Sequence, residues 1–158
     1  MATRRSAGLL LYRRDPEGVR VLLGHMGGPF WARKDEGGWS IPKGELDADE
    51  DPAAAAAREF AEELGVPAPD GEWQQLGDVR SGSKVVSVWA AEGDLDVRTM
   101  VPGTFTLEWP PRSGRLQEFP ELDRAEWLDL ETARLKLVSS QRPLIDRLVE
   151  LLEATRPA

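Results

Sequence analysis

The stretch that most constrains the fold of this chain is GELDADEDPAAAAAREFAEELGV, residues 44–66. Alanine dominates its centre and is the best helix former. Pro52 suits the first position of a helix, and Gly65 suits the residue just past its end. We therefore predict a helix from Pro52 to Leu64, with Asp51 as its N-cap.

Three carboxylates of this helix fall on one side of it. Successive residues of an α-helix are rotated by about 100°, so Glu59, Glu62 and Glu63 share an arc of about 100°. Carboxylates placed so close together repel one another unless a cation neutralises them. Ligand sets made only of oxygen suit hard cations such as Mg²⁺ or Mn²⁺. The alternative is an acidic face that simply meets solvent. The apolar stripe expected to pack against a sheet consists of Ala53, Ala57, Phe60 and Leu64.

The spacing of this segment resembles the signature of the Nudix hydrolase superfamily. That signature is Gly, five residues, Glu, seven residues, Arg-Glu, an apolar residue, any residue, Glu-Glu, any residue, Gly and an apolar residue. Every defined position is filled, by Gly44, Glu50, Arg58, Glu59, Phe60, Glu62, Glu63, Gly65 and Val66. At residue frequencies of roughly 5–7%, a chance match has a probability on the order of 10⁻⁹ per starting position.

The resemblance implies a fold and a chemistry. The fold is of the α/β (α+β) class, a Nudix-type α/β/α sandwich with a mixed β-sheet, as a single domain over residues 1–158. The activity is hydrolysis of a nucleoside diphosphate linked to another group. Mg²⁺, or Mn²⁺ in its place, would be bound by Glu59, Glu62, Glu63 and the Gly44 carbonyl. Glu50 would support the site, and Arg58 would orient the carboxylates.

The rest of the chain predicts hairpins around this helix. Two apolar runs, Ser6–Arg14 and Val19–Met26, flank a turn, and a second pair follows at residues 73–80 and 84–92. Such hairpins argue against a purely parallel sheet. Residues 27–45 predict a long loop, and residues 103–109 and 124–130 predict weaker strands. In the C-terminal segment 139–154, an amphipathic helix is predicted from the helical spacing of Leu144, Leu148, Leu151 and Leu152.

A general base is still required. Family members take it either from the helix, where Glu59 and Glu63 are the catalytic candidates, or from a later loop. In the stretch LQEFPELDRAEW we favour Glu121 because it precedes Trp127 by six residues, as in several Nudix enzymes, and Glu118 is the alternative.

Substrate contacts are predicted from the residues around the helix. The phosphate-binding candidates are Lys43, Arg33 and Lys34. Trp31 and Trp39 are candidates for stacking on a base, with core packing as the alternative. Gln141 is a further candidate for the pocket, and His25 is expected to be structural.

Composition narrows the partners. The net charge of −8 disfavours a general nucleic-acid binder, because phosphate contacts need clustered Lys and Arg. We therefore predict a small nucleotide, a nucleoside triphosphate or dinucleoside polyphosphate, as substrate. The alternatives are removal of diphosphate from RNA 5′ ends, and a non-catalytic nucleotide-binding regulator, which the intact set of glutamates disfavours.

Other properties of the sequence bear on location. The chain has no cysteine, which excludes disulfides and thiolate metal sites. No apolar run approaches the roughly 18 residues of a membrane span. We expect a cytoplasmic protein with no membrane contact, and both a monomer and a homodimer remain open.

Overall fold

The structure is a computed structural model that describes residues 4–155. Its centre is a seven-stranded sheet with the strand order β3-β2-β1-β6-β5, in which β4 also pairs with β1 and β9 with β2. Strands β1 and β6 run parallel, and the other pairs are antiparallel. These strands are β1 (Arg4–Asp15), β2 (Gly18–Met26), β3 (Trp39–Ser40), β4 (Lys43–Glu45), β5 (Gln74–Ser81), β6 (Lys84–Glu92) and β9 (Leu122–Asp129). The predicted mixed sheet and both predicted hairpins are confirmed.

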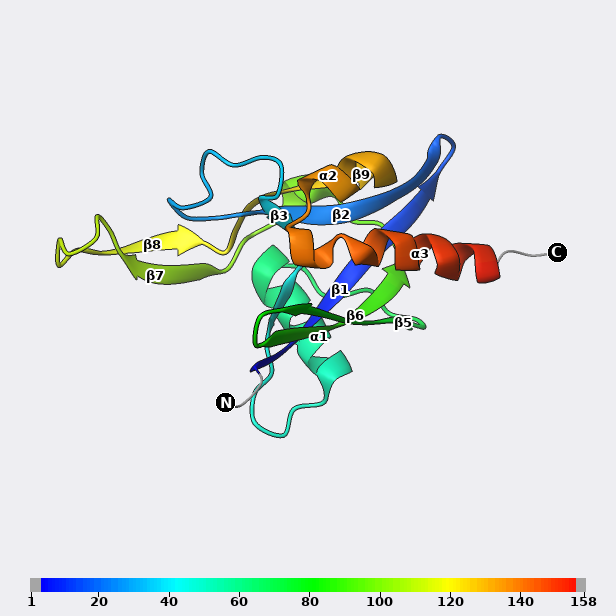
Figure 1. Ribbon diagram of the computed structural model, residues 1–158, viewed down its shortest axis with the longest axis horizontal. Helices are drawn as coiled ribbons and strands as arrows, with labels where there is room; N and C mark the ends of the chain where they lie inside the picture. Colours follow the sequence, from blue (N-terminus) through cyan, green and yellow to red (C-terminus); the bar gives the residue numbers. More distant parts are fainter. Residues whose placement is uncertain (1–3, 156–158) are drawn as a thin grey trace.

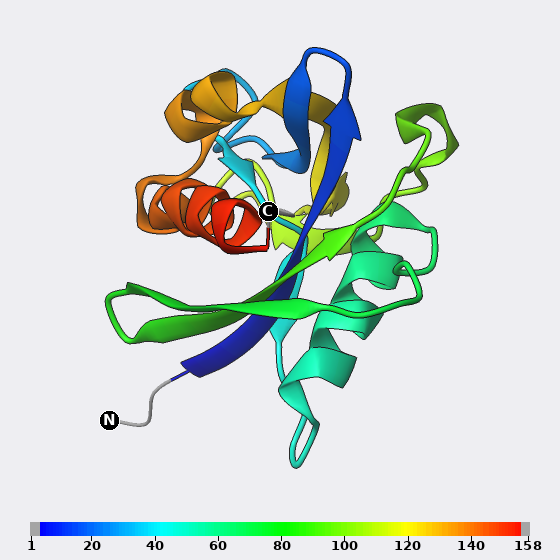
Figure 2. The ribbon, with the colours of Figure 1, turned by 90° about the vertical axis from the view of Figure 1, so that its right-hand side faces the viewer.

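Helices cover both faces of the sheet, as Figure 2 shows. On one side lies α1 (Pro52–Leu64), and on the other lie α2 (Leu130–Lys136) and α3 (Pro143–Ala154). Two short 3₁₀ turns, η1 (Val97–Thr99) and η2 (Ser139–Gln141), complete the helical content of the described residues. This arrangement confirms the α/β/α sandwich. None of the described helices combines the length and the apolar character needed to span a bilayer.

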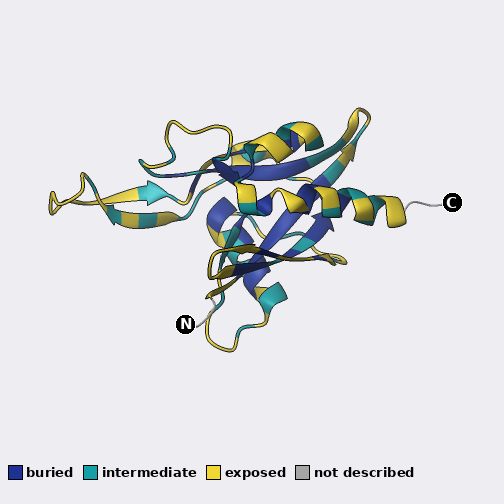
Figure 3. Ribbon diagram, viewed as in Figure 1, coloured by how far each residue is buried: buried dark blue, intermediate teal, exposed yellow. Residues whose placement is uncertain are grey.

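Strand β1 lies at the centre of the sandwich and is buried on both faces (Figure 3). Successive side chains of a strand point to opposite faces. Leu9 and Leu11 therefore pack toward Phe60 of α1, while Leu10 packs toward Leu144 of α3. The sequence of a strand that is covered on both faces is a continuous apolar run, and this explains AGLLLY in β1.

Helix α1 has the ends that its sequence predicts. The Asp51 carboxylate accepts a hydrogen bond from the Ala54 N–H at 3.1 Å. Gly65 adopts a left-handed conformation with φ of 72°, and its N–H donates to the Ala61 carbonyl at 2.8 Å. A left-handed residue just past the helix end is best supplied by glycine.

The buried face of α1 differs from the predicted stripe. Ala53 and Ala57 are only half-buried, whereas the buried residues are Ala55, Ala56, Phe60, Glu63 and Leu64. The helix is therefore rotated so that Ala55 and Ala56 pack on Ala7 of β1. This rotation turns Glu63 inward, toward the sheet.

Other differences from the sequence predictions lie outside α1. The loop 27–45 ends in the short strands β3 and β4, and α2 was not predicted. The C-terminal helix begins at Pro143, after the separate turn η2. Strand β7 (Thr104–Glu108) pairs with β8 (Leu116–Pro120), which was not predicted, and this two-stranded hairpin projects from the body (Figure 1).

Candidate active site

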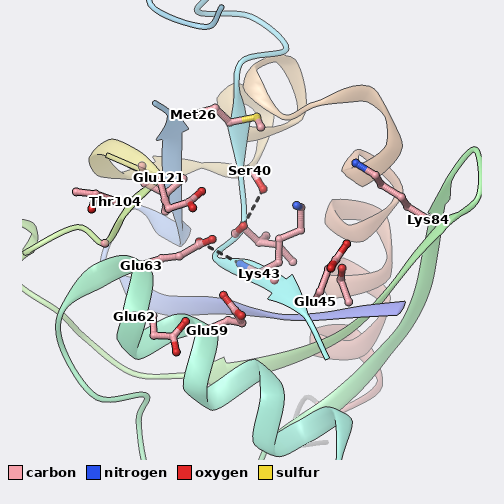
Figure 4. Close-up of a pocket in the computed structure, with 15 residues that line it drawn as sticks. Met26, Ser40, Lys43, Glu45, Glu59, Glu62, Glu63, Lys84, Thr104 and Glu121 are labelled. Atoms are coloured by element: carbon pink, nitrogen blue, oxygen red, sulfur yellow. Dashed lines mark hydrogen bonds between the residues drawn. The ribbon is translucent and has the colours of Figure 1, made fainter. Parts of the chain in front are cut away.

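A cavity of about 410 Å³ lies where α1 faces β4 and the start of β9 (Figure 4). Carboxylates dominate its wall. The site residues predicted from the sequence that line it are Lys43, Gly44, Glu59, Glu62, Glu63 and Glu121. The fold thus brings Glu59, Glu62 and Glu63 together with Lys43 and with Glu121 from a distant segment.

Glu63 is the most buried of these carboxylates, with 9% of its surface exposed. The Lys43 backbone N–H donates to its Oε2 at 3.1 Å. Burial raises the pKa of Glu63 to about 8, and this hydrogen bond opposes the rise only in part. The charged form of Glu63 is therefore costly in the protein alone, and a cation placed against it would offset that cost.

Glu59 lies against the backbone of β4. A Cβ atom at Gly44 would overlap the Glu59 carboxylate, so only glycine leaves room for this side chain. Burial raises the pKa of Glu59, while the neighbouring Arg58 guanidinium opposes the change. Gly44 and Glu59, the first and the fourth defined positions of the motif, are thus joined by a direct packing contact as well as by sequence spacing.

Arg58 connects the carboxylates of the site. Its Nε and Nη2 each donate to Glu50 at 2.9 Å, and its Nη1 donates to Glu59 at 2.8 Å and to Glu62 at 3.2 Å. Nη2 also donates to the Glu45 carbonyl at 3.0 Å. The Arg58 guanidinium lowers the pKa of Glu50 to about 2. The fork of donors therefore fixes the orientation of several acceptors at once.

Glu121 and Glu118 occupy different places. The Glu121 backbone N–H donates to the Gly103 carbonyl at 2.8 Å, and its carbonyl accepts from the Gly27 N–H at 3.0 Å. These bonds hold Glu121 at the cavity, above Glu63 in the view of Figure 4. Glu118 lies on β8, where it accepts from the Thr104 hydroxyl at 2.9 Å, and it does not line the cavity.

The predicted substrate contacts are distributed unevenly. Lys43 lines the cavity, but Arg33 and Lys34 lie in an exposed loop outside its wall. The stacking role predicted for Trp39 is wrong, because its side chain is fully buried and donates from Nε1 to Asp35 at 2.9 Å. Trp31 is half-buried and also lies outside the wall.

Gln141 does not point into the cavity. It is 1% exposed; its Nε2 donates to the Ser40 hydroxyl at 2.9 Å and its Oε1 accepts from the Ile41 N–H at 3.0 Å. Ser40 and Ile41 line the cavity, so Gln141 supports its wall from behind.

His25 is structural, as expected. The side chain is 1% exposed, with Nδ1 2.9 Å from Asp123 and Nε2 2.5 Å from the Lys34 carbonyl. These contacts tie β2 to the start of β9 and to the loop that follows β2. His25 lies outside the cavity wall.

Sequence reasoning missed two charged residues of the cavity, Glu45 of β4 and Lys84 at the start of β6. A single lysine after the turn Ser81–Ser83 carries no recognisable motif. Only the parallel pairing of β6 with β1 brings it to the site.

The donor set of the cavity suits a hard divalent cation. Glu59, Glu62 and Glu63 offer only carboxylate oxygens, and the inward-facing Glu63 lacks a cationic side-chain partner among the described ion pairs. Within residues 4–155, no three acidic or histidine side chains are already gathered closely enough to hold an ion. The carboxylate oxygens of Glu59 and Glu62 instead accept hydrogen bonds from Arg58.

Comparison with known proteins identifies relatives of this chain. A family model described as the NUDIX domain matches residues 2–148. The RNA pyrophosphohydrolase of Acidiphilium cryptum (strain JF-5) is 30% identical over 116 residues, which cover 70% of this chain and 68% of that protein.

Solved structures show the same fold. A Caenorhabditis elegans Ap4A hydrolase in a binary complex superposes with a TM-score of 0.64 at 22% identity, covering 96% of this chain and 98% of that one. The NUDIX domain of Shewanella oneidensis NrtR, complexed with ADP ribose, gives a TM-score of 0.65 at 20% identity, covering 96% and 90%. At these identities the likeness establishes the fold alone.

Proposed function

Because the chain belongs to the Nudix hydrolase family, we propose that it is a Mg²⁺-dependent pyrophosphohydrolase of nucleoside polyphosphates. The observation that supports this most strongly is the one cavity where Glu59, Glu62 and Glu63 meet Lys43 and Glu121. Carboxylates alone would repel a polyphosphate. Their gathering in one cavity makes sense when a divalent cation lies between them and the substrate.

Glu59, Glu62, Glu63 and the Gly44 carbonyl would hold the metal. Mg²⁺ bound there supplies neutralisation of phosphate charge and a site for the attacking water. Glu63 contributes the most strongly desolvated carboxylate, so it gains the most from a cation. Mn²⁺ suits the same oxygen donors.

The protein side chains then divide the remaining work. Glu121, at the cavity wall, accepts a proton from the attacking water as general base. Lys43 binds a phosphate oxygen of the substrate as a point charge. Arg58 keeps Glu59 and Glu62 in orientation, and Glu50 in turn anchors Arg58.

Nucleoside triphosphates and dinucleoside polyphosphates are the first substrate class that we propose. The net charge of −8 favours a small substrate whose charge the metal offsets, over a long nucleic acid that needs a basic track. The second candidate is the 5′ end of RNA, which is supported by the similarity to an RNA pyrophosphohydrolase.

A substrate panel tests the proposal. Release of phosphate or pyrophosphate is measured with Mg²⁺ and with EDTA, for deoxy- and ribonucleoside triphosphates, 8-oxo-dGTP, diadenosine polyphosphates, ADP-ribose, nucleotide sugars and a 5′-triphosphorylated RNA. Turnover of one substrate with kcat/KM of about 10⁴ M⁻¹s⁻¹ or more supports an enzyme of the usual range. Binding of a nucleotide with no turnover across the panel would instead identify a regulatory module.

A further inference from the structure

We propose that Lys84, assisted by Arg4, binds the phosphates of the substrate that lie beyond the cleaved bond. The pair thereby selects triphosphates and longer phosphate chains over diphosphates. This inference rests on the proposed function, because it names the substrate class of the same cavity.

Lys84 lies in the part of the cavity that is remote from Glu121, the proposed general base. It is the first residue of β6 and lines the same wall as Glu59 and Lys43. Figure 4 shows it on the side of Lys43 that is remote from Glu121, with its amino group directed toward the cavity. One end of the cavity therefore carries lysine side chains, and the glutamates of α1 lie between this cationic end and Glu121.

The distance between Lys43 and Lys84 follows from where each pairs with strand β1. Lys43 of β4 pairs with Gly8, and Lys84 of β6 pairs with Arg4. Four residues of a strand extend about 13 Å at about 3.3 Å per residue. The two lysines thus start from separate points along a line, an arrangement that matches an extended anion better than a single phosphate.

Arg4 lies next to Lys84 on the same face of the sheet. Ser6, two residues along β1 from Arg4, lines the cavity, and alternate residues of a strand share a face. Arg5 points to the other face, although it is equally exposed. The neighbouring strands therefore place Arg4 beside Lys84, just beyond the residues that line the cavity.

These cations are free to bind a ligand. None of the ion pairs within residues 4–155 includes Lys43, Lys84 or Arg4, whereas Arg58 pairs with several carboxylates. Glu45 is the acid at this end of the cavity, and it forms no ion pair with Lys84. In a chain of net charge −8, a group of unpaired cations beside a carboxylate site concentrates anions locally.

Inorganic anions of increasing length test the inference directly. Binding of pyrophosphate and of tripolyphosphate is measured by titration calorimetry in Mg²⁺ for the wild type, Lys84→Gln and the control Arg5→Gln. We expect Lys84→Gln to weaken tripolyphosphate binding about 10-fold, the scale of one charged hydrogen bond. Pyrophosphate should lose much less, and Arg5→Gln should match the wild type. Equal losses for both anions, or no loss, would overturn the inference.

Hydrolysis provides the second readout. In Lys84→Gln, kcat/KM should fall more for a nucleoside triphosphate or a diadenosine polyphosphate than for ADP-ribose, whose phosphate chain is shorter. Equal losses on all substrates would contradict selection by chain length. If no nucleotide is hydrolysed, the proposed function fails, and the anion titrations still decide whether the cationic end binds long phosphate chains.

Discussion

The carboxylate of Glu59 packs against the backbone of Gly44, and no space is left between them for a methyl group. A residue of strand β4 and a residue of helix α1, fifteen positions apart in the sequence, thus form one close contact. The glycine at this position serves two purposes in the proposed site: it leaves room for the Glu59 side chain, and its carbonyl is a proposed metal ligand.

Gly44→Ala tests this contact. The added methyl group has to displace Glu59, and overpacking of this kind costs about 1–3 kcal/mol of stability. We expect a folded protein that needs a higher Mg²⁺ concentration for half-maximal turnover. Its kcat/KM should fall about 100-fold, the scale of a catalytic group misplaced by about 1 Å. Circular dichroism and Mg²⁺ titration of turnover check this, and an unchanged Mg²⁺ dependence would contradict it.

Glu63 gives the metal-free protein a specific dependence on pH. Its pKa is raised from 4.5 to about 8 in the folded protein, so the folded state holds a proton that the unfolded state releases above about pH 4.5. The free energy of unfolding should therefore fall as the pH rises between these two values. We expect Mg²⁺ to restore stability, and to do so most strongly at the alkaline end.

Urea denaturation in EDTA at several pH values measures this effect. Glu63→Gln, which cannot ionise, should abolish the fall in stability, and it should also remove nearly all turnover while leaving the fold intact. If wild type and Glu63→Gln lose stability in parallel as the pH rises, Glu63 is not the group responsible. Retained activity with the same Mg²⁺ dependence would exclude Glu63 as a ligand.

Glu121→Gln should lower kcat without changing the affinity for Mg²⁺. A general base contributes roughly 10²- to 10⁴-fold to a rate, and glutamine keeps the size of the side chain without accepting the proton. Glu118→Gln is the matched control, because Glu118 lies outside the cavity wall on β8. A large loss in the control alone would transfer the role of base to Glu118.

Gln141→Leu should destabilise the protein and disturb the site indirectly. The substitution leaves the Ile41 N–H without its buried acceptor, while the Ser40 hydroxyl loses the Gln141 donor but still donates to the Ile41 carbonyl. Each buried polar group left unpaired costs about 1–3 kcal/mol. We expect a lower Tm and a lower kcat for Gln141→Leu. Gln141→Glu should restore only the oxygen that accepts from the Ile41 N–H. An unchanged Tm in Gln141→Leu would show that the wall does not need this support.

The parts of the fold that were predicted depend on short-range signals. The ends of α1 follow from Asp51, Pro52 and Gly65, each of which acts on the backbone within a few residues of its own position. The two hairpins are equally local, since a turn joins the strands of each. Glu59, Glu62 and Glu63 share one helix, so their gathering also follows from sequence spacing.

The parts that were missed depend on contacts between distant segments. Trp39 follows the glycine-rich end of a loop, so the sequence left both base stacking and core packing open. Its burial depends on pairing with β2 and on a bridge to Leu137. The register of α1 on the sheet, which buries Ala55 rather than Ala53, is set by packing on β1. Lys84 reaches the cavity only because β6 pairs in parallel with β1, and no local sequence pattern predicts that pairing.

The projecting hairpin of β7 and β8 has a practical consequence. Its root is fixed, because Thr104 pairs with Pro120 and the Glu121 N–H donates to Gly103. Its tip, residues 110–116, is exposed throughout. A fluorophore or an inserted peptide at the tip would therefore be carried by the ladder of β7 and β8 without displacing Glu121, which makes the tip an attachment point for reporters of substrate binding.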